Sequence, residues 1–277
     1  MPQLRIRKVA VLGAGVMGAQ IAAHLVNADV DTILFDLPAK EGPPNGIVDK
    51  AIANLGKLSP APFASKSKAA AITPANYDQH LDLLKDCDLI IEAIAERMDW
   101  KKALYDRIEA YVAPHAILAS NTSGLSINGL AEVLPESLHS RFCGVHFFNP
   151  PRYMHLAELI PCAKTDREVL EGLETFLVTT LGKGVVYAKD TPNFIGNRIG
   201  VFSILATLHH TAECKLGFDE VDALTGPLLG RPKSATYRTS DVVGLDTMAH
   251  VIKTMADTLP DDPWHKYFKA PDWLKAL

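Results

Sequence analysis

The chain has 277 residues, of which 48% are hydrophobic and 22% charged, and its 28 basic and 32 acidic side chains give a net charge of −4. This balance argues against a disordered chain and, because no basic block stands out, against nucleic acid or a membrane surface as a partner. No apolar run approaches the roughly 18–20 residues of a membrane helix, no targeting segment precedes the first strand, and the four cysteines are widely spaced. We therefore expect a soluble, cytoplasmic protein with reduced thiols and no metal site.

Strand-like and helix-like segments alternate along the first two thirds of the chain. Short β-branched runs predict strands, and runs with helical spacing of apolar residues predict helices. The expected strands are 8–13, 32–37, 88–94, 116–120, 142–148, 155–160 and 185–188, and the expected helices are 19–28, 101–112, 127–134 and 167–181. This alternation predicts a doubly wound, mostly parallel α/β sheet.

Residues 38–80 interrupt the alternation. Prolines break this stretch repeatedly, and helix-like pieces lie between them at 47–58 and 65–71. We expect a helical excursion that leaves the sheet. The stretch carries a modest excess of positive charge, which a solvated helical surface would equally explain, from Lys50, Lys57, Lys66 and Lys68.

A second domain is predicted where the alternation stops. Thr191 is a suitable N-cap and Pro192 suits the first helical position, while Gly217 suits the C′ position at the far end. We therefore expect a sheet domain at 1–189 and a smaller all-helical domain at 190–277. The expected helices of the second domain are 192–216, 219–224 and 241–258.

The first strand and the first helix are joined by a GxGxxG turn at residues 13–18. In this setting Gly13 permits the tight turn, Gly15 lets the backbone approach a pyrophosphate, and Gly18 lets the helix pack closely on the strand. Asp36 ends the second strand, where a carboxylate accepts hydrogen bonds from both ribose hydroxyls and repels a 2′-phosphate. The pattern predicts a Rossmann-type domain that prefers NAD to NADP. A structural turn in an unrelated α/β protein is the alternative.

Polar side chains follow the carboxyl ends of three predicted strands. This edge is where open α/β sheets bind their ligands, so several polar groups converging there indicate a site. These residues are Glu92, Glu96, Ser120, Asn121, Thr122, Ser123, His146 and Asn149.

A histidine and a glutamate on two of these strands are candidates for acid–base chemistry. If 142–148 and 155–160 pair antiparallel about a turn centred on Arg152, His146 and Glu158 lie directly opposite, with Cβ atoms about 4.5–5.5 Å apart. The carboxylate would fix the imidazole tautomer and leave the other ring nitrogen as a base. Alcohol oxidation with hydride transfer to nicotinamide needs such a base. A surface His–Glu pair or a satisfied core histidine is the alternative.

The sequence resembles L-3-hydroxyacyl-CoA dehydrogenases, the NAD-dependent enzymes of fatty-acid β-oxidation. The matching stretches are VAVLGAGVMGAQIA, DLIIEAIAE, SNTSGLSI, HFFNPPRYMHLAELI, LGKGVVYAKDTPNFIGNRI and TGPLLGRPKSATYRTSDVVGLD. The resemblance implies oxidation of (3S)-3-hydroxyacyl-CoA to 3-ketoacyl-CoA with NAD+. The alternatives are an NAD-dependent dehydrogenase of a free hydroxy acid and a non-catalytic NAD-binding protein on the same fold.

The resemblance also implies roles for individual residues. His146 would be the catalytic base with Glu158 as its partner, Ser123 would donate a hydrogen bond to the substrate oxygen, and Asn197 would orient the substrate from the helical domain. Residues 38–80 resemble an arm that reaches toward CoA. The implied cofactor contacts are Gly13, Gly15, Val16, Met17, Gly18, Asp36, Glu96, Lys101, Asn121, Ser123 and Asn149, of which Asn149 would also contact the substrate.

The sequences of these motifs are most similar to those of long bacterial proteins in which an enoyl-CoA hydratase part follows. The family normally runs on to a glycine- and aromatic-rich finish, whereas this chain stops at 272–277 without it. We therefore expect a native polypeptide that extends beyond residue 277. The resemblance also implies a homodimer, whose contacts the family makes through the helical domain.

Overall fold

A computed structural model describes residues 5–271, except for the side chains of 243, 245–247 and 250. The chain divides into two compact units, Met1–Asp190 (unit 1) and Thr191–Leu277 (unit 2). Residues 272–277, where we expected the shortened finish, lie outside the described part of the chain.

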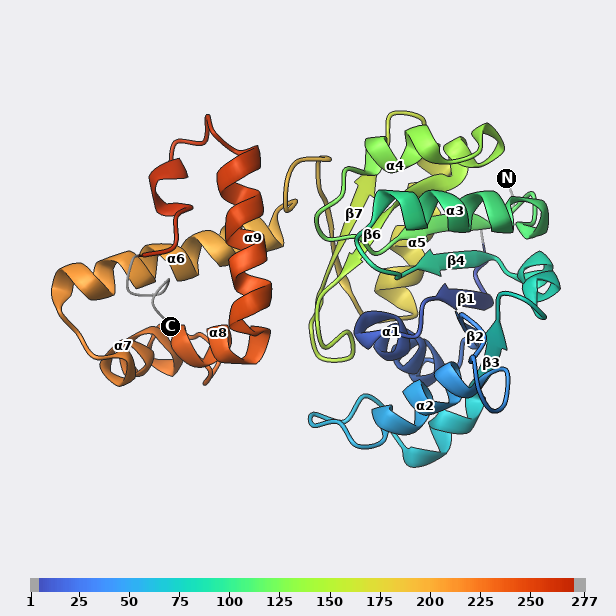
Figure 1. Ribbon diagram of the computed structural model, residues 1–277, viewed down its shortest axis with the longest axis horizontal. Helices are drawn as coiled ribbons and strands as arrows, with labels where there is room; N and C mark the ends of the chain where they lie inside the picture. Colours follow the sequence, from blue (N-terminus) through green and yellow to red (C-terminus); the bar gives the residue numbers. More distant parts are fainter. Residues whose placement is uncertain (1–4, 272–277) are drawn as a thin grey trace. The chain divides into compact units, whose positions relative to one another are not determined.

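Unit 1 is built on an eight-stranded sheet with the order β3-β2-β1-β4-β5-β6-β7-β8 (Figure 1). Neighbouring strands run parallel except for β6 and β7, which run antiparallel. This is the doubly wound, mostly parallel sheet that the sequence predicts. The strands are β1 (Lys8–Leu12), β2 (Asp31–Asp36), β3 (Ile72–Asn76), β4 (Leu89–Glu92), β5 (Ile117–Ser120), β6 (Phe142–Phe147), β7 (Leu156–Pro161) and β8 (Gly184–Tyr187).

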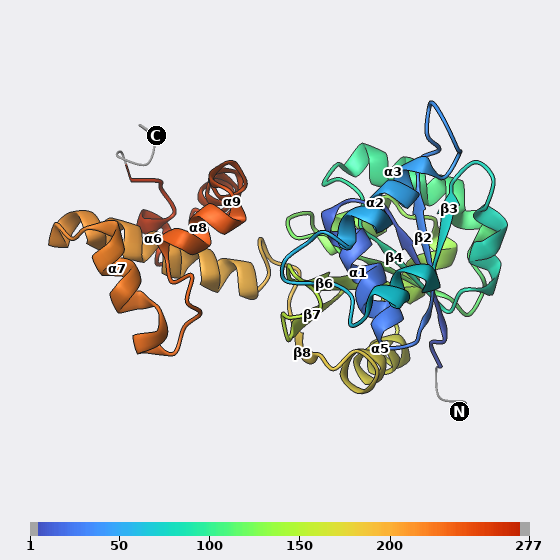
Figure 2. The same cartoon turned by 90° about the horizontal axis from the view of Figure 1, so that it is seen from below.

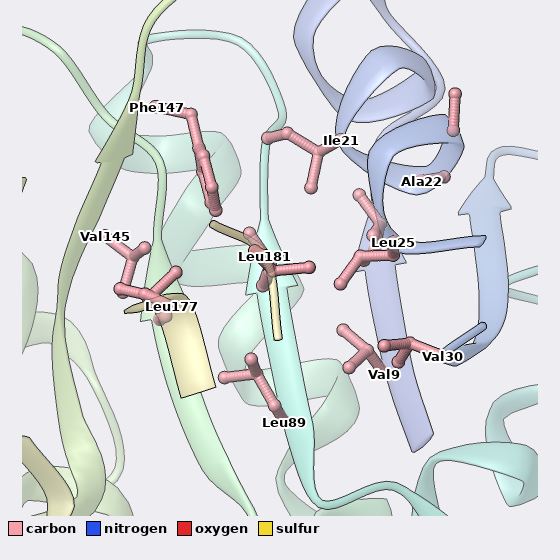
Figure 3. Close-up of a cluster of buried hydrophobic side chains, with 14 of the residues drawn as sticks. Val9, Ile21, Ala22, Leu25, Val30, Leu89, Val145, Phe147, Leu177 and Leu181 are labelled. Atoms are coloured by element: carbon pink, nitrogen blue, oxygen red, sulfur yellow. The ribbon is translucent and has the colours of Figure 1, made fainter. Parts of the chain in front are cut away.

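Helices cover both faces of this sheet. Ile21 of α1 and Leu177 of α5 belong to the same buried cluster as Val145 of β6, and Figure 3 shows them together. On the other face, Ile127 of α4 packs against Gly144 of β6, the neighbour of Val145, because successive strand residues point to opposite faces. The helices are α1 (Val16–Asn27), α2 (Gly46–Leu55), α3 (Met98–Ile108), α4 (Ile127–Val133) and α5 (Arg167–Thr179), with short 3-10 helices at Lys66–Ala71, Leu81–Asp86, Glu109–Tyr111 and Glu136–Arg141.

The expected helical excursion at residues 38–80 is only partly helical. Helix α2 and the 3-10 helix Lys66–Ala71 lie within it, but β3 then returns to the sheet and pairs in parallel with β2. The expectation that the whole stretch leaves the sheet is therefore wrong. The proline in the middle of β3 hid the strand, since proline is a breaker signal in a sequence.

Strand β3 tolerates its proline because it lies at the edge of the sheet. The Pro74 carbonyl accepts a hydrogen bond of 3.2 Å from the Asn45 side chain, and the Asn76 N–H donates one of 3.1 Å to His80. In a strand the N–H and C=O of one residue point the same way, so Pro74 faces away from β2. Its missing N–H costs no bond within the sheet.

Unit 2 is helical around a small core of its own (Figure 1 and Figure 2). Its helices are α6 (Gly196–Cys214), α7 (Phe218–Thr225), α8 (Tyr237–Val243) and α9 (Leu245–Thr258), with short 3-10 helices at Pro227–Leu229 and His265–Tyr267. The core is formed by Leu205, Leu208, Met248, Ile252, Met255 and Phe268. Within residues 5–271, no helix combines the length and apolar character that crossing a bilayer demands.

Three helix boundaries in unit 2 differ from the prediction, and in each case the backbone conformation of nearby residues explains the difference. The first helix begins at Gly196 rather than Pro192, because Asn193 and Phe194 have φ values of 60° and 49°, outside the helical region. It ends at Cys214, because the next residue, Lys215, has the left-handed conformation, and Gly217 is the N-cap of α7 instead of a C′ residue. The single helix expected at 241–258 is replaced by two, α8, which begins earlier at Tyr237, and α9, and Gly244 with φ 91° separates them.

Candidate active site

The glycine turn between β1 and α1 has the geometry that a pyrophosphate needs. Gly13 has φ +106°, and a Cβ there would lie 2.8 Å from the Ala93 carbonyl oxygen. A Cβ on Gly18 would lie 1.8 Å from the Gly13 carbonyl oxygen, whereas one on Gly15 would meet nothing within 4 Å. The first and third glycines are thus required by packing. The second faces open space at the N-terminus of α1, whose unpaired N–H groups attract anions.

A cavity of about 490 Å³ adjoins this turn. Asp36 stands at its edge, where Oδ2 accepts a 2.6 Å hydrogen bond from the Ala14 N–H and Oδ1 accepts one of 2.7 Å from the Leu37 N–H. A carboxylate so fixed suits the ribose hydroxyls of a dinucleotide. The lining residues are Gly13, Gly15, Asp36, Leu37, Tyr77, Ala93, Ile94, Ala95, Trp100, Ala103, Leu104 and Arg107.

The sequence interpretation missed one wall of this cavity. Trp100, Ala103, Leu104 and Arg107 lie on one face of α3, at the i, i+3, i+4 and i+7 spacing that marks a helix face. Trp100 is 52% exposed, an unusual position for an indole. That spacing, next to a predicted cofactor turn, was the signal that could have identified the wall.

Strands β6 and β7 bring His146 and Glu158 together as predicted. The two residues are directly opposite in the antiparallel ladder, and His146 Nδ1 lies 2.7 Å from Glu158 Oε2. Both side chains are buried, with 4% and 0% of the residue exposed. An ionised carboxylate can only accept, so Nδ1 carries the proton of this hydrogen bond. The predicted pairing is confirmed as geometry, and its catalytic role stays a prediction.

The polar segment after β5 is held by a glutamate that we expected to contact the cofactor. Glu96 Oε1 accepts hydrogen bonds from the Ser123 N–H (2.8 Å) and the Ser123 hydroxyl (3.3 Å), and Oε2 accepts one from the Thr122 hydroxyl (2.5 Å). Asn121 is buried, and its Oδ1 accepts a 3.0 Å bond from the Phe147 N–H, next to His146. Ser123 and the His146 strand are thereby tied to neighbouring strand ends.

Two further predicted residues have partners that the sequence does not reveal. Asn149 lies beside the glycine turn, because its Oδ1 accepts a 2.9 Å hydrogen bond from Gln20 of α1. Lys101 is not among the cavity-lining residues; its ammonium group lies 2.6 Å from Glu92 Oε1 inside the protein. The contact of Lys101 with the cofactor stays a prediction. Asn197 lies in the first turn of α6, in unit 2.

The sheet order, the glycine turn, the adjoining cavity and the buried imidazole–carboxylate pair define a dinucleotide-binding dehydrogenase of the doubly wound α/β class. Two family comparisons then cover almost the whole chain. Residues 8–191 match the family described as "3-hydroxyacyl-CoA dehydrogenase, NAD binding domain", and residues 194–277 match "3-hydroxyacyl-CoA dehydrogenase, C-terminal domain". The chain belongs to the 3-hydroxyacyl-CoA dehydrogenase family, and its cofactor is NAD.

Curated relatives carry the same family name over different lengths. A "Probable 3-hydroxyacyl-CoA dehydrogenase" of Deinococcus radiodurans is 44% identical over 94% of this chain and 75% of its own length. A protein of the same description from Bacillus subtilis is 42% identical over 98% of this chain, and a "Putative fatty acid oxidation complex trifunctional enzyme" of Rickettsia felis is 41% identical over 96%. The chain spans only 36% and 37% of these two relatives.

Solved structures agree with this assignment. The crystal structure of (S)-3-hydroxybutyryl-CoA dehydrogenase PaaH1 from Ralstonia eutropha has a TM-score of 0.80 and 28% identity, covering 98% of this chain and 93% of its own. FadB2 of M. tuberculosis has a TM-score of 0.81 at 28% identity, with the same coverage.

Proposed function

We propose that this protein oxidises (3S)-3-hydroxyacyl-CoA to 3-ketoacyl-CoA and that His146 is the general base. The observation that carries the proposal is the buried hydrogen bond of 2.7 Å between His146 Nδ1 and Glu158 Oε2. It lies near the carboxyl end of β6, the edge of the sheet that also carries the glycine turn. A buried, oriented imidazole on this edge suits proton abstraction from a hydroxyl group.

The chemistry follows from the two ring nitrogens of His146. Nδ1 is committed to Glu158, so Nε2 takes the proton of the substrate hydroxyl, and the imidazolium that forms is stabilised by the carboxylate. Bound NAD+ would supply the acceptor for the hydride that leaves the carbon bearing this hydroxyl. With substrate present, the Ser123 hydroxyl exchanges its 3.3 Å bond to Glu96 for one donated to the substrate oxygen, while the 2.8 Å bond from the Ser123 N–H to Glu96 stays in place. Asn149 and Asn197 position the substrate.

The cofactor is held by the residues around the turn. Gly13, Gly15 and Gly18 bring the α1 N-terminus to the pyrophosphate, with Val16 and Met17 as its first helical residues. Asp36 binds the adenosine ribose. Because a carboxylate repels a 2′-phosphate, this position favours NAD over NADP.

An assay of NADH oxidation tests the reaction and the substrate class together. Acetoacetyl-CoA should be reduced at least about 100-fold more efficiently than free acetoacetate, since the free acid lacks the binding energy of the CoA portion. His146→Gln should lose about 10²- to 10⁴-fold in kcat while its NAD+ affinity persists. Equal use of both oxidants would point to a free hydroxy acid dehydrogenase. Near-normal turnover by the variant would refute the role of His146.

We also propose that this dehydrogenase acts beside an enoyl-CoA hydratase part and as a homodimer. The name and the greater length of the trifunctional relative support the first point. Mass photometry and mass spectrometry of the protein isolated from its native cells test both, and a native polypeptide of 30.1 kDa that stays monomeric would contradict them. Four unpaired cysteines, Cys87, Cys143, Cys162 and Cys214, support a reducing compartment such as the cytoplasm.

A further inference from the structure

Residues 148–155 form the turn that joins the strands of His146 and Glu158. We call them the 148–155 turn. Its first half is held by α1, because the Gln20 side chain donates a hydrogen bond of 2.9 Å to Asn149 Oδ1. The side chain that we propose as a substrate contact therefore belongs to a turn whose position depends on other elements.

The middle of the turn is held by the segment between α2 and the next 3-10 helix. The Arg152 guanidinium donates to the carbonyl oxygens of Ala61 and Phe63, each at 2.7 Å. The Tyr153 hydroxyl donates to the same Ala61 oxygen at 2.9 Å. These bonds run from side chains of the turn to the backbone of another segment.

The second half of the turn is held in the opposite sense, through its own backbone. The ammonium group of Lys183 donates to the carbonyl oxygens of Pro151 and Met154, the latter at 2.8 Å. Only 4% of Lys183 is exposed, and a buried amine is costly unless its donors are used. Burial lowers the pKa of Lys183 to about 8, and the neutral amine still has one N–H for each carbonyl. The lysine can therefore hold the turn in both protonation states.

The chain around Lys183 is fixed before its side chain reaches the turn. Leu181 lies in the buried cluster of unit 1 (Figure 3), and its carbonyl oxygen lies 3.2 Å from His24 Nε2. Gly182 has φ 66°, a conformation that favours glycine, and it ends the run of α5. The Lys183 N–H then donates to the Leu177 carbonyl oxygen at 2.9 Å. The lysine side chain thus starts from a rigid point.

We propose that Lys183 is a positioning residue for the dehydrogenase reaction. By holding the backbone of the second half of the 148–155 turn, it keeps Asn149 and His146 in place, on the strand and turn that precede the anchored carbonyls. Both of its bonds go to backbone oxygens, so it acts through the turn. The proposal rests on the function proposed above, because it takes His146 as the base and Asn149 as a substrate contact.

Replacement of the lysine by methionine tests the proposal kinetically. Lys183→Met removes both donors but keeps an unbranched apolar stem, and the contacts of Gln20 and Arg152 remain. Displacement of reacting groups by about 1 Å costs about 10²-fold, so kcat with (3S)-3-hydroxybutyryl-CoA should fall about 10- to 100-fold. The dissociation constant for NAD+, measured by calorimetry, should stay within about threefold of the wild type, because the glycine turn is untouched.

An isotope effect separates positioning from a loss of stability. With substrate deuterated at carbon 3, the isotope effect on kcat should rise in Lys183→Met, because hydride transfer becomes slow relative to product release. A lysine that only stabilises the fold would lower the melting temperature and leave the isotope effect unchanged. That result would overturn the proposal.

Amide hydrogen exchange tests the anchor without using catalysis. The N–H groups of Tyr153 and Met154 both donate to the Pro150 carbonyl oxygen at 3.0 Å, so their exchange reports on the closed turn. Both should exchange at least about tenfold faster in Lys183→Met. If the wild type does not oxidise 3-hydroxyacyl-CoA, the proposed function fails, while exchange at the wild-type rate in the variant means that Lys183 holds nothing.

A lysine of the same stretch provides a matched control. Lys189 is exposed, so Lys189→Met should leave kcat, the isotope effect and the exchange rates at their wild-type values. Faster exchange in Lys183→Met with an unchanged kcat would refute the positioning role. If the methionine variant fails to fold, Lys183→Gln keeps two N–H donors but ends one atom earlier, and its kcat should fall about two- to tenfold. Wild-type kcat in the glutamine variant counts against the proposal.

Discussion

His146 and Glu158 face each other across the β6–β7 ladder with 2.7 Å between Nδ1 and Oε2, although they are twelve positions apart in the sequence. Both are buried. The register of the antiparallel β6–β7 pair therefore sets the orientation of the imidazole.

Glu158→Gln should lower kcat about 10²- to 10⁴-fold, because the amide cannot stabilise the imidazolium as the carboxylate does. The variant is isosteric, and a glutamine oxygen can still accept the Nδ1 proton. NAD+ affinity, measured by calorimetry, should stay within about threefold of the wild type. A fully active variant would show that the carboxylate charge is not needed.

Gly18→Ala should abolish tight NAD+ binding. The added Cβ would lie 1.8 Å from the Gly13 carbonyl oxygen, so either α1 or the turn must move. We expect the dissociation constant for NAD+ to rise at least about tenfold and the melting temperature to fall. Gly200→Ala in α6 is the control: a Cβ there meets nothing within 4 Å, and alanine should stabilise the helix by about 0.5–1 kcal/mol. Unchanged NAD+ binding by the Gly18 variant would contradict the role of the turn.

Asp36→Asn should narrow the preference for NAD+ over NADP+. The amide oxygen can still accept from the Ala14 N–H, which holds the carboxylate at 2.6 Å, whereas the 2.7 Å bond from the Leu37 N–H to Oδ1 is lost together with the charge. Repulsion of the 2′-phosphate then disappears, and the ratio of kcat/KM for the two cofactors should fall about tenfold. An unchanged ratio in steady-state assays would mean that another group selects the cofactor.

His24 should make the protein less stable in mild acid. Burial, with help from the nearby Lys183 charge, lowers the pKa of His24 to about 4. In the unfolded chain the imidazole takes up a proton near pH 6.5, whereas in the folded protein it does so only near pH 4. The free energy of unfolding therefore decreases as the pH falls from about 6.5 to 4, and it levels off below that. We expect a loss of roughly 2–3 kcal/mol across this window.

His24→Gln should flatten this pH dependence. The glutamine can keep a donor for the Leu181 carbonyl oxygen, which accepts from His24 at 3.2 Å in the neutral protein, but it does not titrate. Urea unfolding at pH 4.5 and 7.5 measures the difference. His115→Gln is the comparison, since His115 is 58% exposed and its replacement should leave the slope in place. Equal slopes in wild type and His24→Gln would exclude His24 as the source.

Local patterns predicted the parts of this fold that depend on neighbours in the sequence. The glycine turn, the strands and the opposition of His146 and Glu158 follow from period-two alternation and from turn position, both of which are visible in one sequence. The edge strand was missed because Pro74 reads as a breaker, and only its place at the margin of the sheet makes it tolerable.

Side-chain partners that come from distant elements of the fold could not be predicted from the sequence. The family resemblance implies a cofactor contact for Lys101, but it does not reveal that Glu92, nine residues earlier on a different element, pairs with the ammonium group. Asn193 is a residue type that adopts the left-handed backbone readily, but the same conformation at Phe194, which also delays α6, has no signal in residue type. Such features depend on packing between elements, which periodicity does not contain.

Strand β3 is an edge strand that presents few free backbone hydrogen-bonding groups to another chain. Pro74 supplies no N–H there, its carbonyl is taken by Asn45, and the next outward group, the Asn76 N–H, is taken by His80. Edge strands are the usual templates for intermolecular strand addition and aggregation. Because these outward groups of Pro74 and Asn76 are absent or already bonded, self-association by strand addition is disfavoured at this end of β3, which protects a concentrated solution of the enzyme there against fibril-like stacking.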